Sequence, residues 1–100
     1  MEYAVVVVYD ISDDNLRRDV ENTCKGFGMS HVQRSLFVGI MKEERRRALY
    51  NELERLVSRR GGEFSIRIYR INLRDYEHLF KIGKLSDFED DPIPERLVIG

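Results

Sequence analysis

One carboxylate stands where a strongly hydrophobic stretch of the sequence ends. Residues 3–9 include four consecutive valines, and Asp10 follows this stretch directly. β-Branched side chains favour an extended strand, and the lack of polar alternation predicts that both faces of this strand are covered. An aspartate at the end of such a strand either caps the following turn or does chemistry, and its position alone favours capping.

Two groups of arginines accompany this carboxylate in the sequence, namely Arg17-Arg18 and Arg45-Arg46-Arg47. The planar guanidinium group matches the geometry of phosphate oxygens, so both groups are candidates for phosphate binding. The first group is expected near Asp10, where the chain turns from strand to helix. The simpler interpretation is a solvated helix face with i,i+4 ion pairs, such as Arg17 with Glu21.

Other familiar chemical sites have little support in the sequence. The single cysteine, Cys24, excludes an intrachain disulfide, and no Cys/His cluster suggests zinc. Ser12 and Ser35 have no histidine–acid partner at a suitable spacing, so we interpret them as caps or strand residues. Residues 86–92 are acidic, but the prolines at 92 and 94 favour a solvated connector over a metal site.

Length and composition indicate one globular domain. The chain has 100 residues, of which 42% are hydrophobic and 35% are charged. The formal net charge of −1 is not the basic net charge that would indicate a nucleic-acid-binding protein. No signal peptide and no apolar run long enough to span a bilayer is visible, so a cytoplasmic protein is the default expectation.

The hydrophobic periodicities predict an alternating α+β fold. A strand over residues 3–12 precedes a helix over 13–25, whose apolar stripe is Leu16, Val20, Cys24 and Phe27. Strand character over 29–41 is interrupted near Arg34-Ser35 by either a bend or a tight hairpin. A second helix covers 42–60, and its apolar stripe is Leu49, Leu53, Leu56 and Val57. A strand over 64–71, a helical turn over 76–80 and a short strand over 96–99 complete the order. We assign residues 1–85 to the domain and 86–100 to its C-terminal linker and strand.

Two helices on one face of an antiparallel sheet are the economical way to pack these elements. The sheet face that the helices do not cover is expected to be too apolar to remain exposed to solvent. We expect it to be covered in a symmetric dimer, with the last strand pairing with the partner's sheet edge. The residues assigned to that face are Tyr3, Val5, Val7, Phe37 and Tyr69.

Several of these segments together resemble one known family. They are Tyr9-Asp10-Ile11-Ser12, the helix with Arg17-Arg18, the segment Val32-Gln33-Arg34-Ser35-Leu36-Phe37-Val38-Gly39, the strand with Arg67-Ile68-Tyr69, and the end Leu97-Val98-Ile99. The chain resembles the second core CRISPR-associated protein, the small endoribonuclease-type subunit of the spacer-adaptation machinery. The resemblance extends over essentially the whole chain.

The resemblance implies a ferredoxin-like βαββαβ fold and a symmetric homodimer. It also implies a nuclease that depends on Mg²⁺ or Mn²⁺, cuts single-stranded RNA or double-stranded DNA, and acts in spacer acquisition and antiviral defence. The first core CRISPR-associated protein, the integrase, is the implied protein partner. The alternative is a non-catalytic, homodimeric DNA-binding scaffold that bridges integrase subunits.

The family's metal-binding aspartate falls on Asp10, and its other catalytic-site positions fall on Tyr9, Arg17 and Phe37. We expect Phe37 either to stack a base or to fill the dimer interface. A basic residue common in the family is replaced by His31, which is mostly neutral at pH 7, so we expect weaker RNA contacts or a pH-dependent activity. Arg34, where the family often has an aromatic residue, is a candidate compensating cation. The nucleic-acid-binding candidates are therefore Arg17, Arg18, His31, Arg34, Arg45, Arg46, Arg47 and Arg67.

Overall fold

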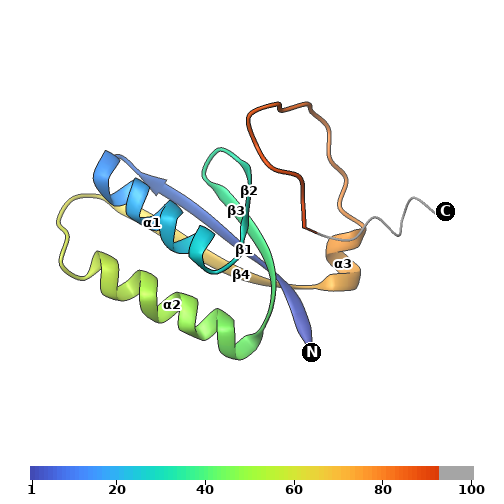
Figure 1. Ribbon diagram of the computed structural model, residues 1–100, viewed down its shortest axis with the longest axis horizontal. Helices are drawn as coiled ribbons and strands as arrows, with labels where there is room; N and C mark the ends of the chain where they lie inside the picture. The colour runs from blue at the N-terminus through green and yellow to red at the C-terminus, as the bar shows by residue number, and fades with distance from the viewer. Residues whose placement is uncertain (93–100) are drawn as a thin grey trace.

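The computed structural model describes residues 1–92 and confirms the predicted α+β class (Figure 1). Its elements are β1 (Glu2–Ile11), α1 (Asp14–Gly26), β2 (Ser30–Gln33), β3 (Leu36–Lys42), α2 (Glu43–Val57), β4 (Phe64–Asn72) and α3 (Leu73–Glu77). The strands form one antiparallel sheet in the order β2-β3-β1-β4. Helices α1 and α2 lie side by side over the same face of this sheet (Figure 1). The strand predicted over 96–99 lies outside the described residues.

Helix α1 begins where its sequence supplies a cap. The Asp13 carboxylate accepts a hydrogen bond from the backbone N–H of Leu16 at 2.7 Å, and Asp14 adds negative charge to the first turn. The predicted apolar stripe is confirmed, since Leu16, Val20 and Cys24 are buried in the core. Helix α2 buries its own predicted stripe, with Leu49 and Leu53 fully covered.

The interruption expected near Arg34 is the hairpin alternative, which joins β2 to β3. Ser35 adopts a positive φ of 61° in the turn, and its carbonyl accepts a hydrogen bond from the backbone N–H of Tyr9 at 3.2 Å. A register shift between His31 and Gln33 separates the two short halves of β2. The helical turn predicted over 76–80 is instead α3, which starts earlier because the Asn72 side chain accepts from the backbone N–H of Arg74 at 2.8 Å.

The two faces of the sheet are assigned by the strand register. Val7 pairs with Phe37 of β3 and with Ile68 of β4, and cross-strand partners share a face. These residues belong to the core beneath the helices. The prediction that Tyr3, Val5, Val7 and Phe37 lie on the opposite face is therefore wrong. Consecutive valines carry no contrast between the two faces, so the sequence could not decide which set points toward the helices.

The face away from the helices, which we call the open face, carries Tyr69 as predicted. Its other apolar residues include Val6, Val8, Val38 and Ile71. Part of it is roofed by the segment that follows α3, with a hollow of about 750 Å³ between segment and sheet. Within residues 1–92, none of the helices has both the length and the apolar character needed to cross a bilayer.

Candidate nucleic-acid site

Asp10 lies near the end of β1 on the open face and is exposed to solvent. The capping role that its position favoured belongs to Asp13 instead. The Asp10 carboxylate makes no hydrogen bond or ion pair with any other described residue. Ser65 of β4, also exposed, is its cross-strand neighbour. The fold therefore leaves both carboxylate oxygens of Asp10 available to a ligand.

An oxygen-ligated cation such as Mg²⁺ is compatible with this position. Mg²⁺ keeps several waters and takes one or two protein carboxylates together with substrate phosphates. Within residues 1–92, no group of three or more His, Cys, Asp or Glu side chains could form a complete cage. Asp10 fits such a cation as one carboxylate ligand, and waters and substrate phosphates can fill the other positions.

Arg17 is held at the junction between β1 and α1. Its guanidinium donates to the Ile11 carbonyl at 3.2 Å and to the Asp14 carboxylate at 2.6 Å. The hydrogen bond that Arg17 donates to Asp14 raises the pKa of Arg17, so the group stays charged. The predicted pairing of Arg17 with Glu21 is wrong, because Arg17 pairs with Asp14 and Glu21 accepts a hydrogen bond from the Tyr9 hydroxyl. Arg18, the next residue, is exposed.

Tyr9 points into the core, away from Asp10, and only 3% of it is exposed. Its hydroxyl donates to Glu21 at 2.7 Å and lies 3.3 Å from Nε2 of His31. Burial raises the pKa of Tyr9 far above its ordinary value, and the hydrogen bond to Glu21 adds to the shift. The hydroxyl thus keeps its proton and ties β1 to α1.

Phe37 is also a core residue, with 0% of it exposed. The ring of His31 stacks on it with centroids 4.2 Å apart and planes 9° apart. Phe37 was expected either to stack a base or to fill the dimer interface, and its place beneath His31, on the helix side of the sheet, offers neither contact. The sequence did not reveal this arrangement because it depends on the β2–β3 register.

His31 connects this core to the end of the described chain. Phe88 meets the His31 ring edge-on at 5.1 Å. The backbone N–H of His31 donates to the Glu89 carboxylate at 2.7 Å, and its carbonyl accepts from the Glu89 N–H at 2.9 Å. Desolvation lowers the pKa of His31, so the ring is neutral at pH 7. The ring of His31 is therefore part of an aromatic stack rather than a free surface cation.

The remaining arginine candidates are dispersed. Arg34 is exposed in the β2–β3 turn, and Arg45 lies over the ring of Phe27 at 4.7 Å. Arg67 is on the open face, where it contacts the Tyr69 hydroxyl at 3.3 Å. Arg46 and Arg47 both meet Glu43. The structure thus brings Arg17, and no residue of the triplet, to the end of β1 that carries Asp10.

Sequence reasoning missed Glu21 and Glu89, which make hydrogen bonds to Tyr9 and His31 respectively. Glu21 lies next to Val20 on α1, at the border of the apolar stripe, and a carboxylate at that border was the available signal. For Glu89 no local signal exists, because its contact with His31 spans 58 positions of the chain.

The arrangement of these elements defines the class of protein before any comparison. An antiparallel sheet with two helices on one face, connected β-α-β-β-α-β, is a ferredoxin-like domain. Asp10 is exposed at one end of its central strand, and Arg17, a side chain suited to bind phosphate, is fixed at the same end.

Comparison with known proteins gives the family. The family model described as "CRISPR associated protein Cas2" matches residues 2–79, and the chain belongs to this family. A relative from Pyrobaculum aerophilum, named CRISPR-associated endoribonuclease Cas2 2, is 33% identical over 79 residues, covering 79% of this chain and 85% of that protein. A relative from Desulforudis audaxviator, named CRISPR-associated endoribonuclease Cas2, is 43% identical over 61 residues, which are 61% of this chain and 58% of the relative.

A third relative joins two activities in its name. The protein from Thermoproteus tenax, named a CRISPR-associated endonuclease Cas1/endonuclease Cas2 fusion, is 31% identical over 78 residues, covering 78% of this chain and 29% of the fusion. Among solved structures, the hypothetical protein TT1823 from Thermus thermophilus superposes with a TM-score of 0.65 at 25% identity, covering 89% of this chain and 96% of that one. A crystal structure titled "cas2" superposes equally well at 22% identity, covering 94% of each chain, which supports the fold.

Proposed function

We propose that the protein is a metal-dependent endonuclease of the spacer-adaptation machinery, acting on single-stranded RNA, double-stranded DNA or both. The observation that carries this proposal is the exposed Asp10 carboxylate, which has no partner among the described residues and no capping role. The names of the relatives from Pyrobaculum aerophilum and Desulforudis audaxviator support the endoribonuclease assignment.

Asp10 and its copy in a second chain would hold one Mg²⁺ or Mn²⁺ between them. Such an ion, when bound, polarises a phosphate and lowers the pKa of a bound water. Arg17 lies at the same end of β1 and is fixed by Asp14 and the Ile11 carbonyl. Its remaining N–H groups would neutralise the phosphate that lies against Asp10. Tyr9 and Phe37 act as supports for the strand that presents Asp10, since both are buried.

A homodimer formed through the open face would bring the two Asp10 residues together. Val8 and Tyr69 on this face are 38% and 45% exposed, more than large apolar side chains in a finished core. Val8 pairs with Arg67 and Tyr69 pairs with Val6 across β1 and β4, and neither Val8 nor Tyr69 lines the hollow beneath the segment that follows α3. Two copies meeting here would bury that surface and place a carboxylate from each chain at one groove.

The integrase of the adaptation machinery is the proposed protein partner. The Thermoproteus tenax relative carries both names in one chain, and proteins that act together are often fused. Work on nucleic acid in spacer acquisition and antiviral defence would take place in the cytoplasm.

The second candidate function is a non-catalytic, DNA-binding homodimer. It is favoured by how little of the predicted catalytic set reaches solvent on the open face, because Tyr9 and Phe37 are buried beneath the helices. In this case Asp10 is a vestigial or structural residue, and affinity resides in the arginines.

Labelled RNA and duplex DNA, incubated with Mg²⁺ or with chelator, distinguish the two functions. If the protein is a nuclease, the wild type cleaves the substrate, and cleavage disappears with chelator or in Asp10→Asn. Asp75 is an exposed aspartate of α3, so Asp75→Asn should cleave like the wild type. Nucleic-acid binding that survives in Asp10→Asn, with no cleavage by any form, would establish the scaffold instead.

A further inference from the structure

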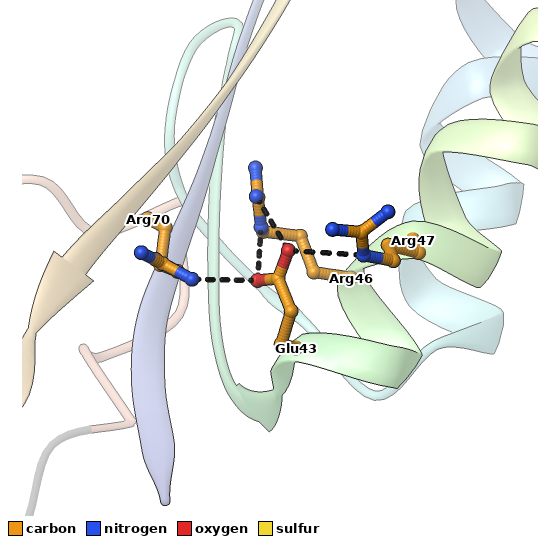
Figure 2. Close-up of polar contacts among 4 residues, drawn as sticks. All are labelled: Glu43, Arg46, Arg47 and Arg70. Carbon is orange, nitrogen blue, oxygen red and sulfur yellow. Dashed lines mark hydrogen bonds and ion pairs between the residues drawn. The ribbon is translucent and has the colours of Figure 1, made fainter.

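Glu43, the first residue of α2, gathers three arginines around one carboxylate (Figure 2). Arg46 donates from Nε and from an Nη atom, both at 2.8 Å. Arg70 reaches across from β4 and donates at 3.2 Å, and the Nε of Arg47 lies 3.4 Å away. We call these four residues the Glu43 cluster. It joins the start of α2 to β4.

The Glu43 cluster carries an excess of positive charge. Hydrogen bonds from Arg46 and Arg70 lower the pKa of Glu43 to about 2, so its carboxylate is ionised at neutral pH. Three guanidinium charges against one carboxylate leave a local charge of +2. The other arginine ion pairs of residues 1–92 match one arginine to one carboxylate, namely Arg17–Asp14, Arg55–Glu52 and Arg60–Asp19.

Most hydrogen-bond donors of the cluster remain free to bind a ligand. Each guanidinium has five N–H groups, and Glu43 engages two of those on Arg46 and one each on Arg47 and Arg70. The side chains of Arg47 and Arg70 are 77% and 43% exposed. Arg70 is further held over the ring of Tyr3 at 4.4 Å. The cluster thus presents to solvent guanidinium groups that are held in place by Glu43 and still have N–H groups free to bind a ligand.

An aromatic platform lies beside these forks. A hollow of about 690 Å³ between α2 and β4 is lined by Arg46 and Arg47 and also by Tyr50 and Phe64. Tyr50 is three residues after Arg47 and four after Arg46, so it lies on the same side of the helix. Tyr50 is half exposed. Cationic forks beside an exposed ring suit a strand whose bases are unpaired, because a base inside a duplex cannot lie flat on a side chain.

We propose that this edge of the molecule binds single-stranded nucleic acid, with backbone phosphates on Arg47 and Arg70 and an unpaired base on Tyr50. The inference deepens the proposed nuclease function by naming a substrate contact remote from Asp10. Ser65, which lies opposite Asp10 in the strand register, is five positions before Arg70 on β4. This corresponds to a separation of roughly 17 Å at about 3.3 Å per residue. Arg70 also faces the helix side, so it holds a flanking phosphate rather than the one at Asp10.

The test is binding of a labelled single-stranded RNA, and of a duplex DNA of equal length, in chelator over a range of salt concentrations. Arg47→Ala and Arg70→Ala should each reduce the slope of log K against log salt for the single strand by about 0.7. Tyr50→Ala should weaken single-strand binding roughly 10-fold with an unchanged slope, and should leave duplex binding unaltered.

Arg55→Ala is the matched control, because it removes an exposed arginine from the same helix and leaves the Glu43 cluster intact. It should bind like the wild type. Denaturation midpoints identify any variant that is poorly folded, and Arg47→Ala is the safest of them because its arginine is mostly exposed.

The proposal is overturned if the salt slopes for single-strand binding by Arg47→Ala and Arg70→Ala equal that of Arg55→Ala. It is also overturned if Tyr50→Ala weakens binding of the single strand and of the duplex equally, or if the wild type does not bind the single strand. These outcomes are separable from failure of the nuclease. Loss of cleavage in Asp10→Asn together with unchanged binding in the cluster variants overturns only this inference. Slope changes in the cluster variants of a protein that cleaves nothing overturn only the nuclease.

Discussion

Tyr9 and Asp10 are neighbours in the chain and lie on opposite faces of the sheet. The Tyr9 hydroxyl is bonded to Glu21 in the core, whereas the Asp10 carboxylate is exposed and without a partner among the described residues. The alternation of a β-strand thereby separates two tasks at one place. Tyr9 fixes the end of β1 against α1, and the carboxylate of Asp10 stays accessible to solvent.

The first prediction concerns which aspartate stabilises the helix. Asp13→Ala should lower the free energy of unfolding by about 1 kcal/mol, because it removes the side-chain cap on the N–H of Leu16. Asp10→Asn should change it by less than about 0.5 kcal/mol, as expected for an exposed residue without contacts. Urea denaturation of both variants measures the difference. Equal losses in the two would mean that Asp10 also caps the turn.

The second prediction separates support from catalysis at Tyr9. Tyr9→Phe should cost about 1 kcal/mol of stability, because Glu21 loses its hydroxyl donor while the ring remains in place. The rate of metal-dependent cleavage at saturating substrate should stay within about twofold of the wild-type rate, because the buried hydroxyl makes no contact with the transition state. A large fall in that rate with unchanged stability would instead make the hydroxyl a catalytic group.

The third prediction is a pH dependence that originates at His31. Its folded pKa lies below the ordinary value of about 6.5, so between these two values the unfolded chain binds more protons than the folded one. Stability should therefore be full above the ordinary pKa and should fall as the pH is lowered through it. Glu21 and Glu89 moderate this effect, and Lys25 enhances it.

The measurement for His31 is the urea midpoint at pH 7.5 and at pH 5.0. His31→Gln should lose less stability between these two values than the wild type loses. If both proteins fall by the same amount, the titration belongs to other groups.

The fourth prediction tests the open face as the dimer interface. Val8→Asp replaces an exposed apolar residue of β1 with a charge, two positions from Asp10 and on the same face. It should convert a homodimer to a monomer in sedimentation experiments while the helix content by circular dichroism is retained. Cleavage should disappear with the dimer, because one Asp10 is only half of the proposed cation site. Glu2→Lys, at the far end of the same strand, is the control.

Within residues 1–92 the sequence was sufficient to predict the two long helices, the order of the strands and the place of Asp10 near the end of β1. Helix periodicity and an abrupt change from valines to a carboxylate are local signals. It could not orient the sheet, since Val5 and Val6 are identical in chemistry and face opposite sides. The environment of Phe37 depends on His31 across a register shift, and that of Glu43 on Arg70 from a distant strand. Such contacts are set by tertiary pairing, which single-sequence patterns do not encode.

The burial of Cys24 in α1 has a practical consequence. Its thiol is fully covered, and desolvation raises the pKa of Cys24 to about 12, so almost no thiolate exists at neutral pH. Maleimide and methanethiosulfonate reagents should therefore leave the native protein unmodified. A single cysteine introduced at Asp10 would then accept a spin label selectively, and the label-to-label distance would report directly how two copies face one another.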